Sequence, residues 1–233
     1  AFCLRQYVIY LRNPQESCST LLPEFVKKMA PLCRLHLLLV GMYVHDAFGS
    51  SRTMQVPLDH FVRLDSRKWG MRYWVDDTHW KKNQSAPVFL GMGGEGGQGP
   101  PGGQMMEMAE EHGGLGVTIE HRYYGESLPL GSASFSTANL QWLSIEQALA
   151  DAAYVARQLH QQYNLTADAR WVAFGGSYSG EVAAWARIKY PSVFYAAVAS
   201  SAPVTAAVDY KGYDGVVANA LKRESVGGSE ACY

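Results

Sequence analysis

Short apolar runs separated by helical patterns constrain the fold of this chain most strongly. Each run is continuous in apolar character instead of alternating with polar residues, and the runs lie at residues 87–90, 115–119, 170–174 and 195–199. Strands of this kind are buried on both faces, as in a parallel sheet that helices cover on either side. The sequence therefore predicts an α/β fold.

Helical patterns fill the intervals between these runs. The longest begins at Ser144, which precedes Gln147 by three residues as in a capping box, and continues as an apolar stripe to Leu159. Shorter helices are expected at residues 105–112, 180–189 and 216–223, and a hairpin is expected between residues 61–64 and 69–75. The alternation of strand and helix thus extends over most of the chain after residue 55.

Composition excludes several classes of function. The chain has 233 residues, 48% of them hydrophobic, and a net charge of −1, which is enough for one sizeable core and gives no basic surface for nucleic acid or an anionic membrane. No CxxC motif and no other metal-ligand spacing occurs, so neither a metal nor a cofactor is expected. No apolar run reaches the roughly 20 residues that span a bilayer.

Residues 1–50 read as an upstream stretch. A short basic start, an apolar run and a small-residue exit at about residues 29–48 have the layout of a secretory signal peptide, and a buried N-terminal helix is the alternative. Two sequons, at Asn83 and Asn164, would be surface glycan acceptors in a secreted protein, although such triplets also arise by chance. Four cysteines are present, and Cys232 lacks an intrachain partner if the region that holds Cys3, Cys18 and Cys33 is removed.

The sequence GGSYSG at residues 175–180 carries the strongest chemical signal. It lies between a buried strand and a helix, which is the context of a nucleophile elbow with Ser177 at its tip. The residues two before and two after the nucleophile must be small, and Gly175 and Ser179 satisfy this, although glycine is usual at the second place. Gly176 and Gly180 complete the turn. A phosphate-binding loop is excluded because no Lys-Ser/Thr pair follows the glycines.

An oxyanion hole is expected beside this serine. The backbone N–H of Tyr178 and the N-terminus of the following helix would face the developing negative charge. The second donor would come from the glycine-rich residues 91–97, at Gly94 or Glu95, because this segment directly follows an earlier strand. A merely flexible turn is the alternative reading of the segment.

The chain resembles the serine carboxypeptidase S28 family. The motifs that carry the resemblance are GGSYSG at 175–180, HRYYGESLP at 121–129, GGEG at 93–96, QVPLDHF at 55–61, SIEQALAD at 144–151 and ASSAPV at 199–204. The resemblance covers about residues 54–233, and residues 194–228 look most like the branch of thymus-specific serine proteases. Glu181 departs from the small or apolar residue expected after the elbow.

The resemblance implies an α/β-hydrolase fold, a Ser–Asp–His triad and a helical insertion after the strand that follows the elbow helix. Residues 51–204 would form the core and residues 205–233 the start of the insertion, inside which the chain is expected to stop. The family also implies a serine-type exopeptidase that acts on peptides, in several members after proline, in the secretory pathway, either secreted or lysosomal or vacuolar. Carboxypeptidase and dipeptidyl-peptidase activities are not distinguished.

The expected catalytic histidine and acid are absent from the sequence. All seven histidines precede Ser177, whereas the order in this fold is serine, acid, histidine. His121 is the least implausible substitute base. We therefore expect this chain alone to be inactive and poorly stable, with an exposed sheet edge. An esterase or lipase, or a truncated product that binds peptides without turnover, are the alternatives.

Overall fold

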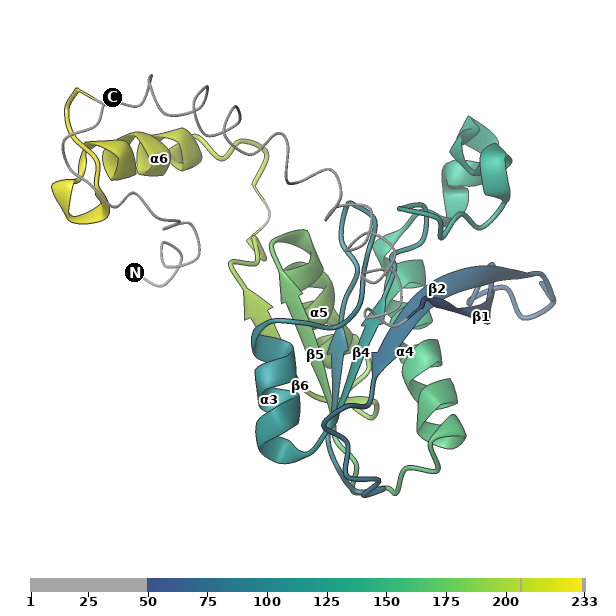
Figure 1. The fold of residues 1–233 in the computed structure, drawn as a ribbon. Coiled ribbons are helices and arrows are strands. Elements are labelled where there is room, and N and C mark those ends of the chain that lie inside the picture. The colour runs from purple at the N-terminus through teal and green to yellow at the C-terminus, as the bar shows by residue number, and fades with distance from the viewer. Residues whose placement is uncertain (1–49, 206, 232–233) are drawn as a thin grey trace, which may run out of the picture. The chain divides into compact units, whose positions relative to one another are not determined.

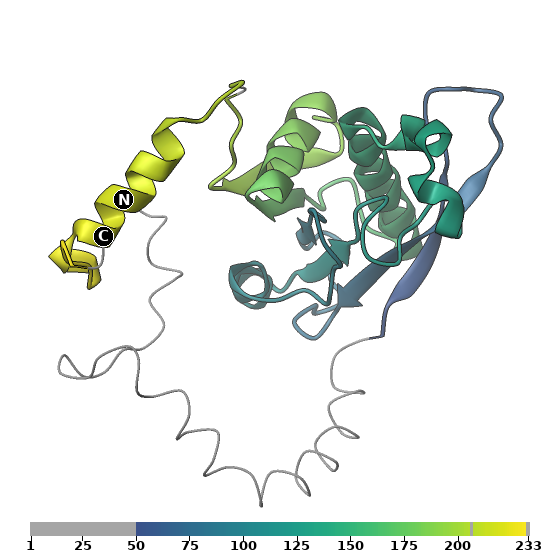
Figure 2. The same ribbon diagram turned by 90° about the horizontal axis from the view of Figure 1, so that it is seen from above.

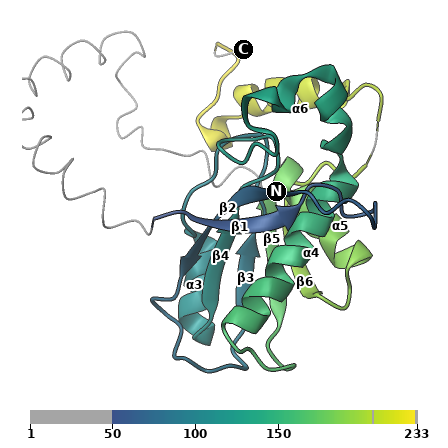
Figure 3. The same cartoon turned by 90° about the vertical axis from the view of Figure 1, so that its right-hand side faces the viewer.

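A six-stranded sheet lies at the centre of the computed structural model, which describes residues 50–205 and 207–231 (Figure 1). The strands are β1 Arg52–Pro57, β2 Lys68–Asp76, β3 Val88–Gly91, β4 Leu115–Ile119, β5 Trp171–Gly176 and β6 Phe194–Ser200, in the order β1-β2-β4-β3-β5-β6. The last four of these strands run parallel to one another. β1 and β2 add an antiparallel edge, which faces the viewer in Figure 3.

Helices cover both faces of this sheet, as Figures 1 and 2 show. α3 (Gln104–His112) lies on one face, where Met105 and Ala109 pack against Phe89 and Phe174. α4 (Ile145–Gln162) and α5 (Tyr178–Lys189) cover the other face and contribute to the larger core. The α/β-hydrolase fold class expected from the sequence is confirmed.

The hairpin at the sheet edge differs from the one expected. β2 pairs with β1, in the register Arg52↔Tyr73 to Pro57↔Lys68, and residues 61–64 lie in the loop between the two strands. Asp59 turns the chain there, because its Oδ1 accepts hydrogen bonds from the N–H groups of Phe61 at 2.8 Å and Val62 at 3.2 Å. Residues 61–64, although mostly apolar, therefore form a loop, and the prediction of a strand there was wrong.

The capping box at the start of α4 forms only in part. The Ser144 hydroxyl caps the helix by accepting from the Gln147 N–H at 3.3 Å. The Gln147 side chain points to the loop after β1 instead of back to the cap: its Nε2 donates to Asp59 Oδ1 at 2.9 Å, and its Oε1 accepts from the His60 N–H at 3.0 Å. The same glutamine that starts the helix thus fastens a distant loop.

The chain divides into two compact units that meet in sequence at Ala202 and Pro203. The second unit holds α6 (Gly212–Lys222), which begins four residues before the expected helix, and a short 3-10 helix, Glu224–Val226. No described residue of α6 is buried. The assignment of this unit to a helical insertion stays a prediction.

The remaining expectations concern the ends of the chain and the sheet. The expected signal peptide at about 29–48 and all four cysteines lie outside the described residues. Within residues 50–205 and 207–231, no helix is long and apolar enough to cross a membrane. Over the same ranges β6 is the last strand of the sheet, and its Tyr195 is 56% exposed.

Candidate active site

Ser177 stands at a sharp turn between β5 and α5. Its φ of 57° and ψ of −130° lie in a region that residues other than glycine rarely adopt, and the residue is exposed. Such a conformation costs about 1–3 kcal/mol and persists only where the surroundings hold it. Three hydrogen bonds do so: the Ser177 N–H donates to Ser200 O at 3.0 Å, and Ser177 O accepts from the N–H groups of Gly180 at 2.9 Å and Glu181 at 3.2 Å.

The flanks of the turn are in close contact. A Cβ on Gly175 would lie 2.0 Å from the carbonyl oxygen of Ser179, so no larger residue fits at 175 without moving the backbone. The Ser179 hydroxyl accepts from the Gly176 N–H at 3.0 Å and lies 2.8 Å from the Gly176 carbonyl oxygen, to which it donates. The serine at 179, where glycine is usual, is accommodated because its hydroxyl bridges the turn.

The glycine-rich segment 91–97 lies against the elbow. The Met92 N–H donates to Phe174 O at 2.8 Å, which prolongs the pairing of β3 with β5 and directs the segment toward Ser179. A Cβ on Gly94 would lie 3.5 Å from Ser179 Cβ, whereas one on Gly93 would lie 2.4 Å from the backbone nitrogen of His121. The segment thus fits between β4 and the elbow, with Gly94 beside the turn and the neighbouring Glu95 exposed.

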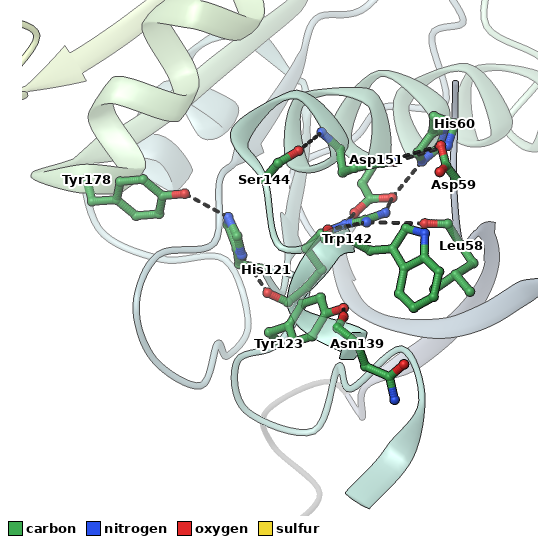
Figure 4. Close-up of polar contacts among 12 residues, drawn as sticks. Leu58, Asp59, His60, His121, Tyr123, Asn139, Trp142, Ser144, Asp151 and Tyr178 are labelled. Carbon is green, nitrogen blue, oxygen red and sulfur yellow. Dashed lines mark hydrogen bonds and ion pairs between the residues drawn. The ribbon is translucent and has the colours of Figure 1, made fainter. Parts of the chain in front are cut away.

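The side chain of Tyr178 is held by a contact with His121. Its hydroxyl lies 3.0 Å from His121 Nε2, while His121 Nδ1 lies 2.7 Å from the Arg122 carbonyl oxygen (Figure 4). A carbonyl only accepts, so Nδ1 carries the proton, and in the neutral ring Nε2 then accepts from the tyrosine hydroxyl. The Tyr178 N–H is at the first helical position, where the helix offers it no acceptor.

Burial keeps both partners of this contact neutral. Burial lowers the pKa of His121 below its usual 6.5, against the opposing effect of its bond to the Arg122 carbonyl. Burial also raises the pKa of Tyr178 to about 12. Both ring nitrogens of His121 are engaged by partners other than Ser177, because Nδ1 donates to the Arg122 carbonyl and Nε2 accepts from the Tyr178 hydroxyl. Among the described histidines, none is hydrogen-bonded to Ser177.

The neutral state of His121 predicts a loss of stability in acid. Because the folded pKa lies below the unfolded value of about 6.5, the unfolded chain binds more protons once the pH falls below that value. The stability contribution is fully present above about pH 6.5 and decreases as the pH falls toward the folded pKa. Urea unfolding of wild type and His121→Asn at pH 7 and pH 5 should show a smaller difference for the variant. Equal differences would contradict the assignment.

Glu120 connects the loop after β3 to the loop after β4, both of which lie beside the elbow. It is 1% exposed, and it accepts hydrogen bonds from the Gln98 N–H at 3.0 Å, the Glu126 N–H at 3.1 Å and the Ser127 hydroxyl at 2.8 Å. A Cβ on Gly125 would lie 2.0 Å from its Oε1, so that glycine is required there. The sequence reasoning missed Glu120, although an acidic residue directly after a buried strand was a usable signal.

A buried ion pair supports the same region from α4. Arg122, whose side chain is fully buried, donates from Nε to Asp151 Oδ2 at 2.6 Å and from Nη2 to Oδ1 at 2.8 Å (Figure 4). His60 Nε2 lies 2.7 Å from the same Oδ1, and the Trp142 carbonyl accepts from Arg122 Nη1 at 2.8 Å. Because Arg122 engages both oxygens of Asp151, this Asp–His pair belongs to the scaffold and not to the chemistry at Ser177. Over the described ranges, no three His, Cys, Asp or Glu side chains gather as a metal site.

A comparison with known protein families identifies the family of this chain. Residues 56–233 match the family described as serine carboxypeptidase S28. The chain belongs to this family. The resemblance seen in the motifs is thereby confirmed, and the matched range includes the elbow, the glycine-rich segment and the HRYYGES loop.

Three curated relatives show how similar the chain is to members of this family and how much of their length it covers. Mouse thymus-specific serine protease is 43% identical over 182 residues, which are 77% of this chain and 35% of the relative. Mouse lysosomal Pro-X carboxypeptidase is 42% identical over 154 residues, 63% of this chain and 30% of the relative. A probable extracellular serine carboxypeptidase of Arthroderma benhamiae is 38% identical, covering 73% of this chain and 25% of the relative. The chain thus spans about a third of the first relative's length.

Proposed function

We propose that this chain is the nucleophile-bearing part of a serine exopeptidase, with Ser177 as the nucleophile. The observation that carries the proposal is the exposed, strained serine between β5 and α5 at the carboxyl edge of a parallel sheet. Binding at this edge is the rule for open α/β sheets. Glycine at position 177 would relieve this backbone strain, so the presence of serine there is consistent with a requirement for its hydroxyl.

In the proposed reaction Ser177 Oγ attacks the carbonyl carbon of a peptide bond. A base takes the hydroxyl proton, the carbonyl oxygen becomes an oxyanion, and the base then returns the proton to the leaving amine. The N–H of Tyr178 and that of Gly94 or Glu95 would donate to the oxyanion, and the N-terminus of α5 adds a favourable field. Water then hydrolyses the resulting ester.

The base and its acid partner are proposed to come from sequence that follows this chain in longer relatives. The seven histidines all precede Ser177, and His121, the least implausible substitute base, is engaged at both nitrogens. Without a base the serine hydroxyl stays protonated at neutral pH and is a poor nucleophile. We therefore propose that the 233-residue chain does not turn over substrate by itself.

The substrates are proposed to be peptides that contain proline, and the location to be secreted or lysosomal. Support comes from the relative named lysosomal Pro-X carboxypeptidase and the one named extracellular serine carboxypeptidase. An esterase would use the same elbow, and a truncated product could bind peptides without cleaving them.

A fluorophosphonate probe tests the proposal, because it labels only an activated serine. A parent chain extended beyond Tyr233 should be labelled, while its Ser177→Ala variant and the 233-residue chain should not. Labelling of the Ser177→Ala parent at another residue would refute the assignment of the nucleophile. Cleavage of prolyl-linked peptides against simple esters by the labelled parent then separates a peptidase from an esterase.

A further inference from the structure

The two sequons, 81 residues apart in sequence, lie side by side in the structure. The Thr166 N–H, in the sequon of Asn164, donates to the carbonyl oxygen of Gln84, in the sequon of Asn83, at 2.9 Å. The segments that carry them also share an aromatic contact, since the rings of Trp80 and Tyr163 meet edge to face at 5.4 Å. Two glycans attached here would therefore occupy one region of the surface.

This region is at the amino end of the parallel strands. The Val88 N–H at the start of β3 donates to Arg170 O, just before β5, at 2.9 Å, and both sequon loops end there. Ser177 follows Arg170 by the length of β5, so at about 3.3 Å per residue it is roughly 23 Å away. In Figure 1 these loops lie at the end of the sheet opposite the start of α5. Glycans at the sequons would leave the edge at Ser177 open.

Both asparagines can accept a glycan as they stand. Each is exposed. The Asn83 Oδ1 accepts from the Ser85 N–H at 3.1 Å and the Ser85 hydroxyl at 2.9 Å, bonds that engage the oxygen and not the amide nitrogen to which a sugar is attached. Asn164 has a φ of 51°, a conformation that asparagine tolerates better than most residues.

Directly before Asn83 the loop exposes a dibasic pair. Lys81 and Lys82 are both exposed, and Lys82 has a φ of 56°. Exposed loop tips are the preferred sites of proteolytic nicking, and a dibasic pair suits trypsin-like endopeptidases. A glycan on Asn83 would be attached to the residue on the far side of the Lys82–Asn83 peptide bond, and the glycan on Asn164 would stand beside it.

We propose that Asn83 and Asn164 both carry N-linked glycans, which together form one carbohydrate cover over the amino end of the sheet and shield the Lys81–Lys82 loop from proteolysis. The proposal rests on the secretory location in the proposed function. In the modification, the asparagine amide nitrogen bonds to the anomeric carbon of an oligosaccharide. The bond from that carbon to the phosphate of a lipid-linked donor breaks, and the lipid pyrophosphate leaves with the amide proton.

Site occupancy is tested on the full 233-residue chain expressed in eukaryotic cells behind a supplied secretory signal, with a reporter sequon after Tyr233. Molecules with a glycosylated reporter are treated with peptide-N-glycosidase in heavy-oxygen water, and mass spectrometry reads which asparagines become labelled aspartates. Labels at both Asn83 and Asn164 support the proposal. Ser85→Ala and Thr166→Ala should each remove one label, whereas Ser85→Thr and Thr166→Ser should keep both. A labelled reporter with unlabelled Asn83 and Asn164 overturns the proposal.

Shielding is tested on the same material with trypsin. The rate of cleavage after Lys81 and Lys82 should be several-fold lower in the glycosylated chain than after enzymatic removal of the glycans. Cleavage after Lys222, which no sequon flanks, serves as the internal reference. Equal rates before and after deglycosylation would overturn the shielding. Because the signal is supplied and no peptidase activity is measured, failure here is distinct from failure of the proposed function.

Discussion

Replacing Asp151 by asparagine should lower the free energy of unfolding by about 3–5 kcal/mol, the typical cost of removing one partner of a buried ion pair. The Arg122 guanidinium is fully buried, and Asp151 is its anionic partner. In the variant the guanidinium keeps its charge and loses the compensating carboxylate. Urea unfolding of the wild type and Asp151→Asn, followed by far-ultraviolet circular dichroism, measures the difference.

Two controls make this result specific to the buried pair. The double variant Arg122→Met/Asp151→Asn should lose less stability than the sum of the two single variants, by about 0.5–3 kcal/mol, because the two residues are in contact. Glu126→Gln, which breaks the ion pair with Arg72, should change the stability far less, because the Glu126 side chain is 80% exposed and water screens its charge. Additive single changes, or an Asp151→Asn variant as stable as the wild type, would show that the pair contributes little.

Gly175→Ala should destabilise the chain by about 1–3 kcal/mol, the range typical of overpacking. Its added methyl would lie 2.0 Å from the Ser179 carbonyl oxygen and 2.6 Å from the Gly180 nitrogen, both of them backbone atoms of α5 that no side-chain rotation can move. The turn at Ser177 must therefore open. In a parent chain that is labelled by a fluorophosphonate, the same change should abolish the labelling, because the hydroxyl leaves its position.

Gly176→Ala is the matched control, one residue further along. The nearest atom to a Cβ there is the Ser200 carbonyl oxygen at 3.9 Å, an ordinary contact. Its stability should stay within about 0.5 kcal/mol of the wild type, as is usual for surface changes. If the two alanine variants unfold at the same urea concentration, close packing at 175 is not what shapes the elbow.

The buried strands and the tight turn at Ser177 could be predicted, because each is determined by residues that are neighbours in sequence. Continuous apolar runs predicted the strands β3 to β6, and the small residues around Ser177 predicted the tight turn, because burial on both faces and a sharp bend each impose a pattern on neighbouring letters. The loop at residues 61–64 has the composition of a strand. It was misread because the hydrogen bonds of Asp59, and not apolar content, decide its conformation.

The connections that hold the site could not be predicted in this way. Glu120 bonds to Gln98, and Asp151 joins Arg122 to His60; these partners are 22 to 91 residues apart in sequence. A charged residue's type gives no indication of its distant partner. The contact between His121 and Tyr178, across 57 residues, was missed for the same reason.

At position 177, selection for stability and selection for activity should favour different residues. Its φ of 57° and ψ of −130° suit glycine, so a library varied at position 177 and screened only for resistance to heat should be enriched in glycine. The same library, carried in a complete enzyme and screened for peptide hydrolysis, should return serine. A serine at such a position thus indicates that selection for activity outweighed selection for stability.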